Sequence, residues 1–143
     1  MMRLSIVATI ALLAGCPDPV DPPPWVEISA ITKPPPASSA SIRNTEYLNG
    51  ETIDVYEITL SAGVAIATRC ADSCAYTNSF QIGCAGAKLT AGDPSLLGVW
   101  PVYHDGDPGE FALVASAPGA TTLRVQTSCA TQDYTVNIVP RTP

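Results

Sequence analysis

The sequence predicts an all-β domain, an antiparallel β-sandwich of about seven short strands, over residues 25–143. Apolar residues recur there with a period of two, which is the period of half-buried strands and not of helices. No amphipathic segment has the length of a helix. Gly, Asn and Pro recur between the apolar segments and predict turns at the short intervals typical of a sandwich.

Residues 1–15 predict an export signal. A positive start, Met-Met-Arg, precedes a ten-residue apolar run at 4–13 and the small residues Ala14 and Gly15. This order is typical of signal peptides. Because crossing a bilayer takes about 20 apolar residues, the run is too short to be a transmembrane helix. We therefore expect residues 1–15 to be cut from the mature chain.

The tetrapeptide Leu13-Ala14-Gly15-Cys16 resembles the lipobox of bacterial lipoprotein precursors at all four positions. The resemblance implies that the Cys16 thiol takes a diacylglycerol group, that a peptidase cuts before it, and that the new amine takes an acyl chain such as palmitate. Two or three chains hold a protein on a bilayer durably, whereas one alone is marginal. The alternative is an ordinary secretory signal followed by a chance cysteine.

The same resemblance bears on localisation. Under the enterobacterial sorting rule, aspartate directly after the lipidated cysteine retains a lipoprotein in the inner membrane. Here Pro17 follows Cys16 and Asp18 comes next. The outer membrane is therefore expected over the inner one, in bacteria that obey this rule.

Residues 16–24 predict a spacer between the lipid and the domain. Five of the eight residues at 17–24 are proline, which favours an extended polyproline II rod. At about 3.1 Å per residue the rod would hold the domain roughly 25 Å from the bilayer. A ligand for a proline-reading module is the alternative interpretation.

The charge of the chain argues against nucleic acid as a partner. The formal charge is −6, and it becomes −7 when Arg3 leaves with the signal peptide, because all 13 carboxylates remain. No basic patch is present that would replace counterions on phosphates or adsorb to anionic lipid. Attachment to a membrane would depend on the lipid at Cys16.

The first strands are predicted from alternation and from proline. Residues 25–31 read as an edge strand, because three prolines follow at 34–36 and proline is tolerated at sheet edges. Residues 33–41 then read as a loop or a broken strand. Residues 52–61 read as a strand whose apolar side chains change face, which a β-bulge near Val55 would explain. Residues 64–67 and 80–82 are further strand candidates.

The last three strands have the clearest alternation. Their predicted inward sets are Phe111, Leu113 and Ala115; Leu123, Val125 and Thr127; and Tyr134, Val136 and Ile138. Residues 109–125 and 134–139 resemble the last three strands of bacterial immunoglobulin-like domains. The resemblance implies an immunoglobulin-like sandwich. Residues 69–104 depart from it through their cysteines and long loops, which leaves the strand order there open.

Four cysteines remain once Cys16 is assigned to lipid: Cys70, Cys74, Cys84 and Cys129. An even number in an exported chain predicts two disulfides, which persist in an oxidising compartment. All three pairings stay open, although we expect Cys129 to join the last hairpin to the cysteine-rich loop. Zinc is the alternative, but the spacings of 4, 10 and 45 lack the Cys-x2-Cys pairs of zinc ribbons.

The acidic segment at 105–110 allows two interpretations. It follows the single histidine, His104, and contains Asp105, Asp107 and Glu110. Its Asp, Gly and Pro residues are those that tight turns require. The alternative is a calcium site, since Ca²⁺ prefers carboxylate oxygens at such spacing, although the segment is too short for an EF-hand.

Catalysis has little support in the sequence. No Gly-x-Ser-x-Gly, His-Glu-x-x-His or phosphate-loop motif is present, and Glu46, Glu51, Asp54 and Glu57 are spaced like solvent-facing acids. Most aromatic residues are expected in the core. Residues 100–103, Trp-Pro-Val-Tyr, are predicted in a loop, and core packing is favoured there over an exposed platform for protein or sugar.

These observations predict a membrane-anchored envelope lipoprotein that is not an enzyme and acts as a binding or accessory module. The partner would be a protein or a glycan, and no cofactor is expected beyond the covalent lipid on Cys16. The alternatives are a purely structural surface lipoprotein, a calcium- or sugar-binding adhesin module and, last, an envelope hydrolase.

Overall fold

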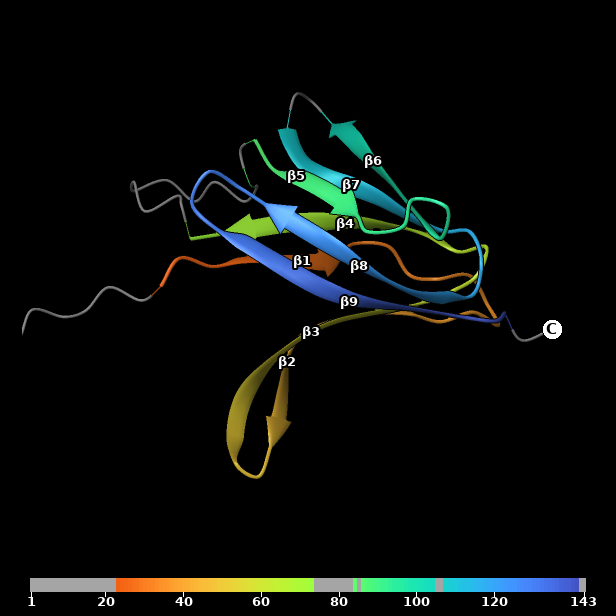
Figure 1. Ribbon diagram of the computed structural model, residues 1–143, viewed down its shortest axis with the longest axis horizontal. Coiled ribbons are helices and arrows are strands. Elements are labelled where there is room, and N and C mark those ends of the chain that lie inside the picture. Colours follow the sequence, from red (N-terminus) through yellow and green to blue (C-terminus); the bar gives the residue numbers. More distant parts are fainter. Residues whose placement is uncertain (1–22, 74–83, 85, 105–106, 142–143) are drawn as a thin grey trace, which may run out of the picture.

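The computed structural model describes residues 23–73, 84, 86–104 and 107–141, and this part of the chain forms a β-sandwich without a helix (Figure 1). Sheet I has the order β1-β4-β7-β6, and sheet II has the order β2-β3-β9-β8-β5. The strands are β1 (Val26–Ala30), β2 (Ala40–Leu48), β3 (Glu51–Ser61), β4 (Ala65–Asp72), β5 (Lys88–Ala91), β6 (Leu97–His104), β7 (Asp107–Ala115), β8 (Gly119–Gln126) and β9 (Thr131–Val139).

The predicted fold class is confirmed, and the described residues form nine strands in place of about seven. Two of them, β2 and the expected strand β3, form a hairpin. Without them, sheet I has the strand order of the ABED sheet of a constant-type immunoglobulin sandwich, and β5, β8 and β9 have the order of its CFG sheet. β3 lies parallel to β9, which corrects the expectation of purely antiparallel pairing.

The core lies between the sheets and includes the inward residues of the predicted alternation. Ile58 and Leu60 from β3 and Leu113 from β7 are fully buried. The predicted inward sets of the last three strands, Phe111 to Ala115, Leu123 to Thr127 and Tyr134 to Ile138, are all at most 9% exposed. Burying each large aliphatic side chain contributes about 1.5–3 kcal/mol, which drives the two sheets together.

The edges of sheet I explain where proline and tryptophan occur. β1 is an edge strand, as predicted from the prolines that follow it. β6 is the other edge, so residues 100–103 belong to a strand and not to the predicted loop. Pro101 is tolerated there because an edge strand leaves alternate backbone N–H groups without a ladder partner.

One disulfide is defined within the described residues. Cys70 on β4 is bonded to Cys84, and both are fully buried. Cys129 is disulfide-bonded too. Cys74 lies outside the described residues, as do Cys16, the export signal, residues 16–22 of the spacer and the predicted strand at 80–82. No helix in the described part of the chain is long and apolar enough to span a membrane.

Candidate functional site

The β2–β3 hairpin leaves the sandwich at a β-bulge. Arg43 pairs with Glu57 and Thr45 pairs with Asp54, so two residues of β3, Val55 and Tyr56, lie opposite a single residue of β2. Tyr56 adopts a positive φ of 46°. The bulge predicted near Val55 is therefore confirmed, and it bends the hairpin away from sheet II.

We call residues 44–56, beyond the bulge, the arm. Figure 1 shows the arm projecting from the sandwich. β9 pairs with β3 only over Glu57–Ser61, so no described strand outside the hairpin pairs with the arm. Asn49 and Gly50 close the hairpin with φ values of 52° and 90°, which is the geometry of a type I′ turn.

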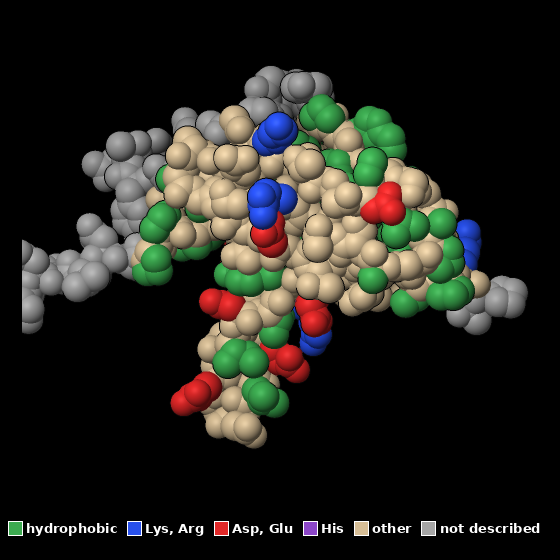
Figure 2. Space-filling view, in the orientation of Figure 1, with side chains coloured by type: hydrophobic (Ala, Val, Ile, Leu, Met, Phe, Trp, Pro, Cys, Tyr) green, Lys and Arg blue, Asp and Glu red, His purple; other side chains and the backbone are tan. Residues whose placement is uncertain are grey.

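The arm carries a mixed apolar and acidic surface. Tyr47 is 75% exposed, Leu48 51% and Ile53 40%. Across the hairpin Glu46 lies opposite Ile53 and Leu48 lies opposite Glu51, so these two apolar side chains each have an acid directly across from them, whereas Tyr47 lies opposite Thr52. Green apolar and red acidic side chains alternate on the arm in Figure 2. The arm contains no Lys or Arg.

A buried hydrogen-bond network holds the base of the arm. The Tyr134 hydroxyl accepts from Ile28 N–H at 2.9 Å and donates to Asn44 Oδ1 at 2.7 Å. Asn44 Nδ2 then donates to the Ile28 carbonyl at 3.1 Å. The N–H and carbonyl groups of Ile28 lie on the edge of β1 that faces away from β4. Both are therefore hydrogen-bonded by side chains and not by a neighbouring strand. Burial, above all, raises the pKa of Tyr134.

Acidic groups crowd together beside the base of the arm. Burial, followed by the nearby charge of Asp54, raises the pKa of Glu27 on β1. Arg43, next to the arm on β2, is ion-paired with Glu57 and lies 3.8 Å from Glu46. These two contacts raise the pKa of Arg43, with Glu57 the main cause. Among the described residues Arg43 offsets only part of this negative charge, so the potential around the arm is negative.

A second exposed feature is Trp100 on edge strand β6. Its side chain is on the outer face of sheet I, since it pairs with half-buried Ala112, and it is 53% exposed. A Cβ added at Gly98 would lie 2.1 Å from Cη2 of Trp100, so the six-membered ring covers this glycine. Core packing, the favoured expectation for Trp100, is wrong, and Trp25 is also exposed, at 43%.

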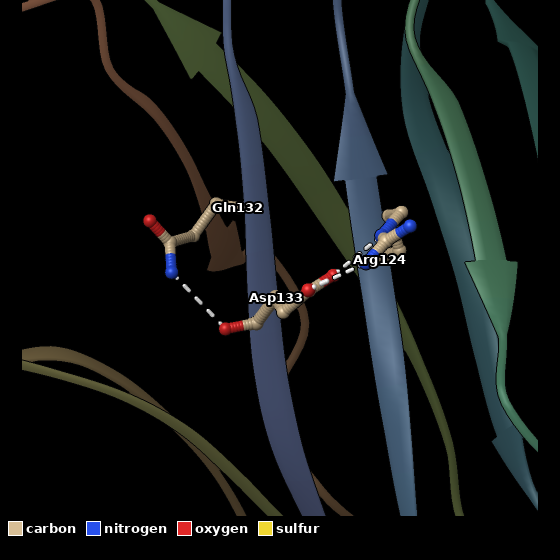
Figure 3. Close-up of polar contacts among 3 residues, drawn as sticks. All are labelled: Arg124, Gln132 and Asp133. Atoms are coloured by element: carbon tan, nitrogen blue, oxygen red, sulfur yellow. Dashed lines mark hydrogen bonds and ion pairs between the residues drawn. The ribbon is translucent and has the colours of Figure 1, made fainter.

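The outer face of sheet II contains a shallow hollow of about 550 Å³. Arg124 and Asp133 dominate it, with Arg124 Nε and Nη2 donating to the two carboxylate oxygens at 2.7 and 2.8 Å (Figure 3). This contact lowers the pKa of Asp133 and raises that of Arg124. Because Arg124 and Asp133 neutralise each other, the pair presents no net charge to a ligand in the hollow. Its lining residues are Thr90, Ala91, Gly92, Thr122, Arg124 and Asp133.

The predicted calcium ligands are described only in part. Glu110 lies within β7, and its carboxylate accepts from Arg69 Nη2 at 2.7 Å. Asp105 and the side chain of Asp107 lie outside the described residues. No group of three or more metal-ligating side chains occurs among the residues described. The calcium interpretation therefore stays a prediction, and one of its three carboxylates is ion-paired.

Reasoning from the sequence missed β2 and the apolar surface of the arm. The segment Asn49-Gly50 between two alternating runs is a strong hairpin signal and could have located it. The four acids at 46, 51, 54 and 57 lie in this hairpin: Glu51 and Asp54 are exposed, and Glu46 and Glu57 are half-buried. Comparison of the chain with protein-family models, curated proteins and solved structures found no match.

Proposed function

We propose that this protein is a lipid-anchored, non-enzymatic binding module of a bacterial cell envelope, and that the arm is the element that contacts a partner protein. The lipobox that ends at Cys16 supports the anchoring, and the proline-rich spacer supports a position about 25 Å from the bilayer. The observation that carries the binding role is the arm, which holds Tyr47, Leu48 and Ile53 in solvent.

Three large apolar side chains held in solvent do not contribute the free energy of burial to the stability of the domain. Their exposure is therefore best explained by an interaction with a partner. An isolated two-stranded hairpin is marginally stable in water, so the arm depends on its base for its conformation. Within a folded domain, large apolar side chains on a projecting element add little to stability. Tyrosine is enriched at interface hot spots, where it buries its ring and hydrogen-bonds through its hydroxyl.

Site-directed photo-cross-linking of the full-length, membrane-inserted lipoprotein tests this role. A photoreactive phenylalanine analogue replaces Tyr47 in one variant and Thr122, exposed on the outer face of sheet II, in a matched control. We expect a discrete adduct from position 47, none from 122, and loss of the adduct when Leu48→Asp is added. The absence of an adduct specific to position 47 would favour a purely structural lipoprotein.

The anchoring itself has a separate test. Cys16→Ser removes the thiol that the lipobox resemblance assigns to diacylglycerol, so the chain is expected to stay unprocessed or to leave the membrane fraction. Metabolic labelling with a clickable palmitate should label the wild type and not the variant. A variant that is still cleaved, labelled and membrane-bound contradicts the assignment.

A second candidate function, saccharide binding, rests on Trp100. Gly98 allows the indole to lie against β6, and the ring stays 53% exposed beside small Ala112. A flat, exposed indole is suited to stacking on the apolar face of a sugar ring. Trp25→Phe leaves Trp100 as the sole tryptophan, so its emission can be titrated with N-acetylglucosamine trisaccharide and with cellotriose. Emission that shows no saturable change with either sugar removes this candidate.

A further inference from the structure

The outer edge of β3 in the arm is open for pairing. Glu51–Asp54 pair with β2 on one side, and β9 begins to pair with β3 only at Glu57. All four residues from 51 to 54 are exposed. In an antiparallel hairpin every second residue directs its N–H and C=O away from the partner strand. The described part of the chain supplies no strand to this edge.

The charges of the arm select the kind of strand that can pair there. The arm carries Glu46, Glu51 and Asp54 and no cation, for a net charge of −3. Glu27 adds a fourth carboxylate beside Asp54. Two copies of the arm would place carboxylates against one another, which opposes self-pairing at the edge. An occupant rich in Lys or Arg would instead neutralise these groups.

The apolar residues of the arm set the remaining requirement. Leu48 and Ile53 share one face of the hairpin with Glu46 and Glu51, while Tyr47 and Asp54 share the other. A strand added along β3 therefore meets Glu51 and Ile53 on one face and Thr52 and Asp54 on the other. From this arrangement we infer that the arm binds an extended cationic segment of a partner protein, in which Lys or Arg alternates with apolar residues, as an added strand along β3. The inference rests on the proposed binding function.

Synthetic peptides of about nine residues, long enough to span the arm, test the inference directly. In three of them valine alternates with lysine, serine or glutamate. A fourth is the lysine peptide with every second amide N-methylated, which keeps its charge and removes its strand donors. The protein is the full-length lipoprotein in nanodiscs of neutral phosphatidylcholine, so that cationic peptides have no anionic lipid to bind.

We expect saturable binding of the lysine peptide, weakened about tenfold or more between about 50 and 500 mM NaCl because the charges lie at an exposed surface. The serine, glutamate and N-methylated peptides should bind at least about tenfold more weakly. Glu51→Gln with Asp54→Asn should remove most of the binding. The matched control, Thr122→Lys with Thr135→Lys, changes the net charge equally on the outer face of sheet II and should retain it.

Equal binding of the lysine and serine peptides, or full binding of the N-methylated peptide, would overturn the inference. Binding unchanged by the Glu51 and Asp54 substitutions would do the same. If photo-cross-linking at position 47 still yields a partner, the proposed function survives and only the chemistry of the segment is wrong. If neither experiment detects binding, both fail.

Discussion

Tyr134→Phe tests the network that joins the two sheets to the base of the arm. The substitution keeps the ring, which is 1% exposed and packs edge-on against Tyr56 with ring centroids 5.5 Å apart. It removes only the hydroxyl, which accepts from Ile28 N–H and donates to Asn44. Any change in stability therefore reports on these two hydrogen bonds.

The expected loss follows from the burial of Ile28, which is 1% exposed. Without the hydroxyl its N–H has no acceptor, and leaving a buried donor unsatisfied costs about 1–3 kcal/mol. Asn44 is half-buried and can hydrogen-bond water instead. Losing its hydrogen bond with Tyr134 should therefore cost nearer the net value of about 1 kcal/mol for an ordinary hydrogen bond. We expect Tyr134→Phe to cost about 2–3 kcal/mol and to lower the Tm by about 10 °C.

Urea denaturation followed by tryptophan emission measures this loss, and Tyr56→Phe is the matched control. The Tyr56 hydroxyl forms no hydrogen bond within the described residues, so its removal should cost less than about 0.5 kcal/mol. A double-mutant cycle with Asn44→Ala should give a coupling energy of about 1 kcal/mol, because both residues belong to one network. A Tyr134→Phe protein within about 0.5 kcal/mol of wild type would refute this reasoning.

Three further outcomes are expected. The raised pKa of Tyr134 means that its contribution to stability is full below about pH 10, the pKa of an unfolded tyrosine, and falls as the pH rises towards the folded pKa. Urea titrations at about pH 9 and 11 should show this loss in wild type and a smaller loss in Tyr134→Phe, where burial still raises the pKa of Tyr56. Replacing Cys70 and Cys84 by Ala should cost about 3 kcal/mol, since the disulfide joins residues 14 positions apart, and a Tm unchanged on reduction would argue against a stabilising bridge. Gly98→Ala should lower stability by at least about 1 kcal/mol more in wild type than in a Trp100→Ala background, because the added Cβ would lie 2.1 Å from the indole; equal effects in both would show that the ring does not lie over the glycine.

Prediction from the sequence succeeded where one local pattern decides the structure. The alternation of residues 111–115, 123–127 and 134–138 identified the inward side chains of β7, β8 and β9, because a strand with one buried face must place its apolar residues on that face. The phase change at residues 52–61 located the bulge near Val55 for the same reason. The prolines after residue 31 identified β1 as an edge strand.

Prediction from the sequence failed where the structure depends on pairing between strands that are distant in the sequence. Trp100 lies outside the core because its register with Ala112 of β7 places it on the outer face of sheet I, and this register does not follow from the residues around it. The parallel pairing of β3 with β9 joins residues almost 80 positions apart, such as Glu57 and Thr135. The candidate site was missed because its acids were identified without the hairpin that sets them beside Tyr47, Leu48 and Ile53.

The sequence by itself determined the all-β class, the inward faces of the clearest strands and the bulge, because strand periodicity and backbone sterics act over a few residues. Only the tertiary structure decided that the hairpin beyond that bulge stands free. β9 stops pairing with β3 at Glu57, and Asn44 and Tyr134 fix the base against β1. Whether a strand finds a neighbour depends on chain segments far away in the sequence, so an exposed acidic and apolar arm emerges only once the sandwich has closed around its core.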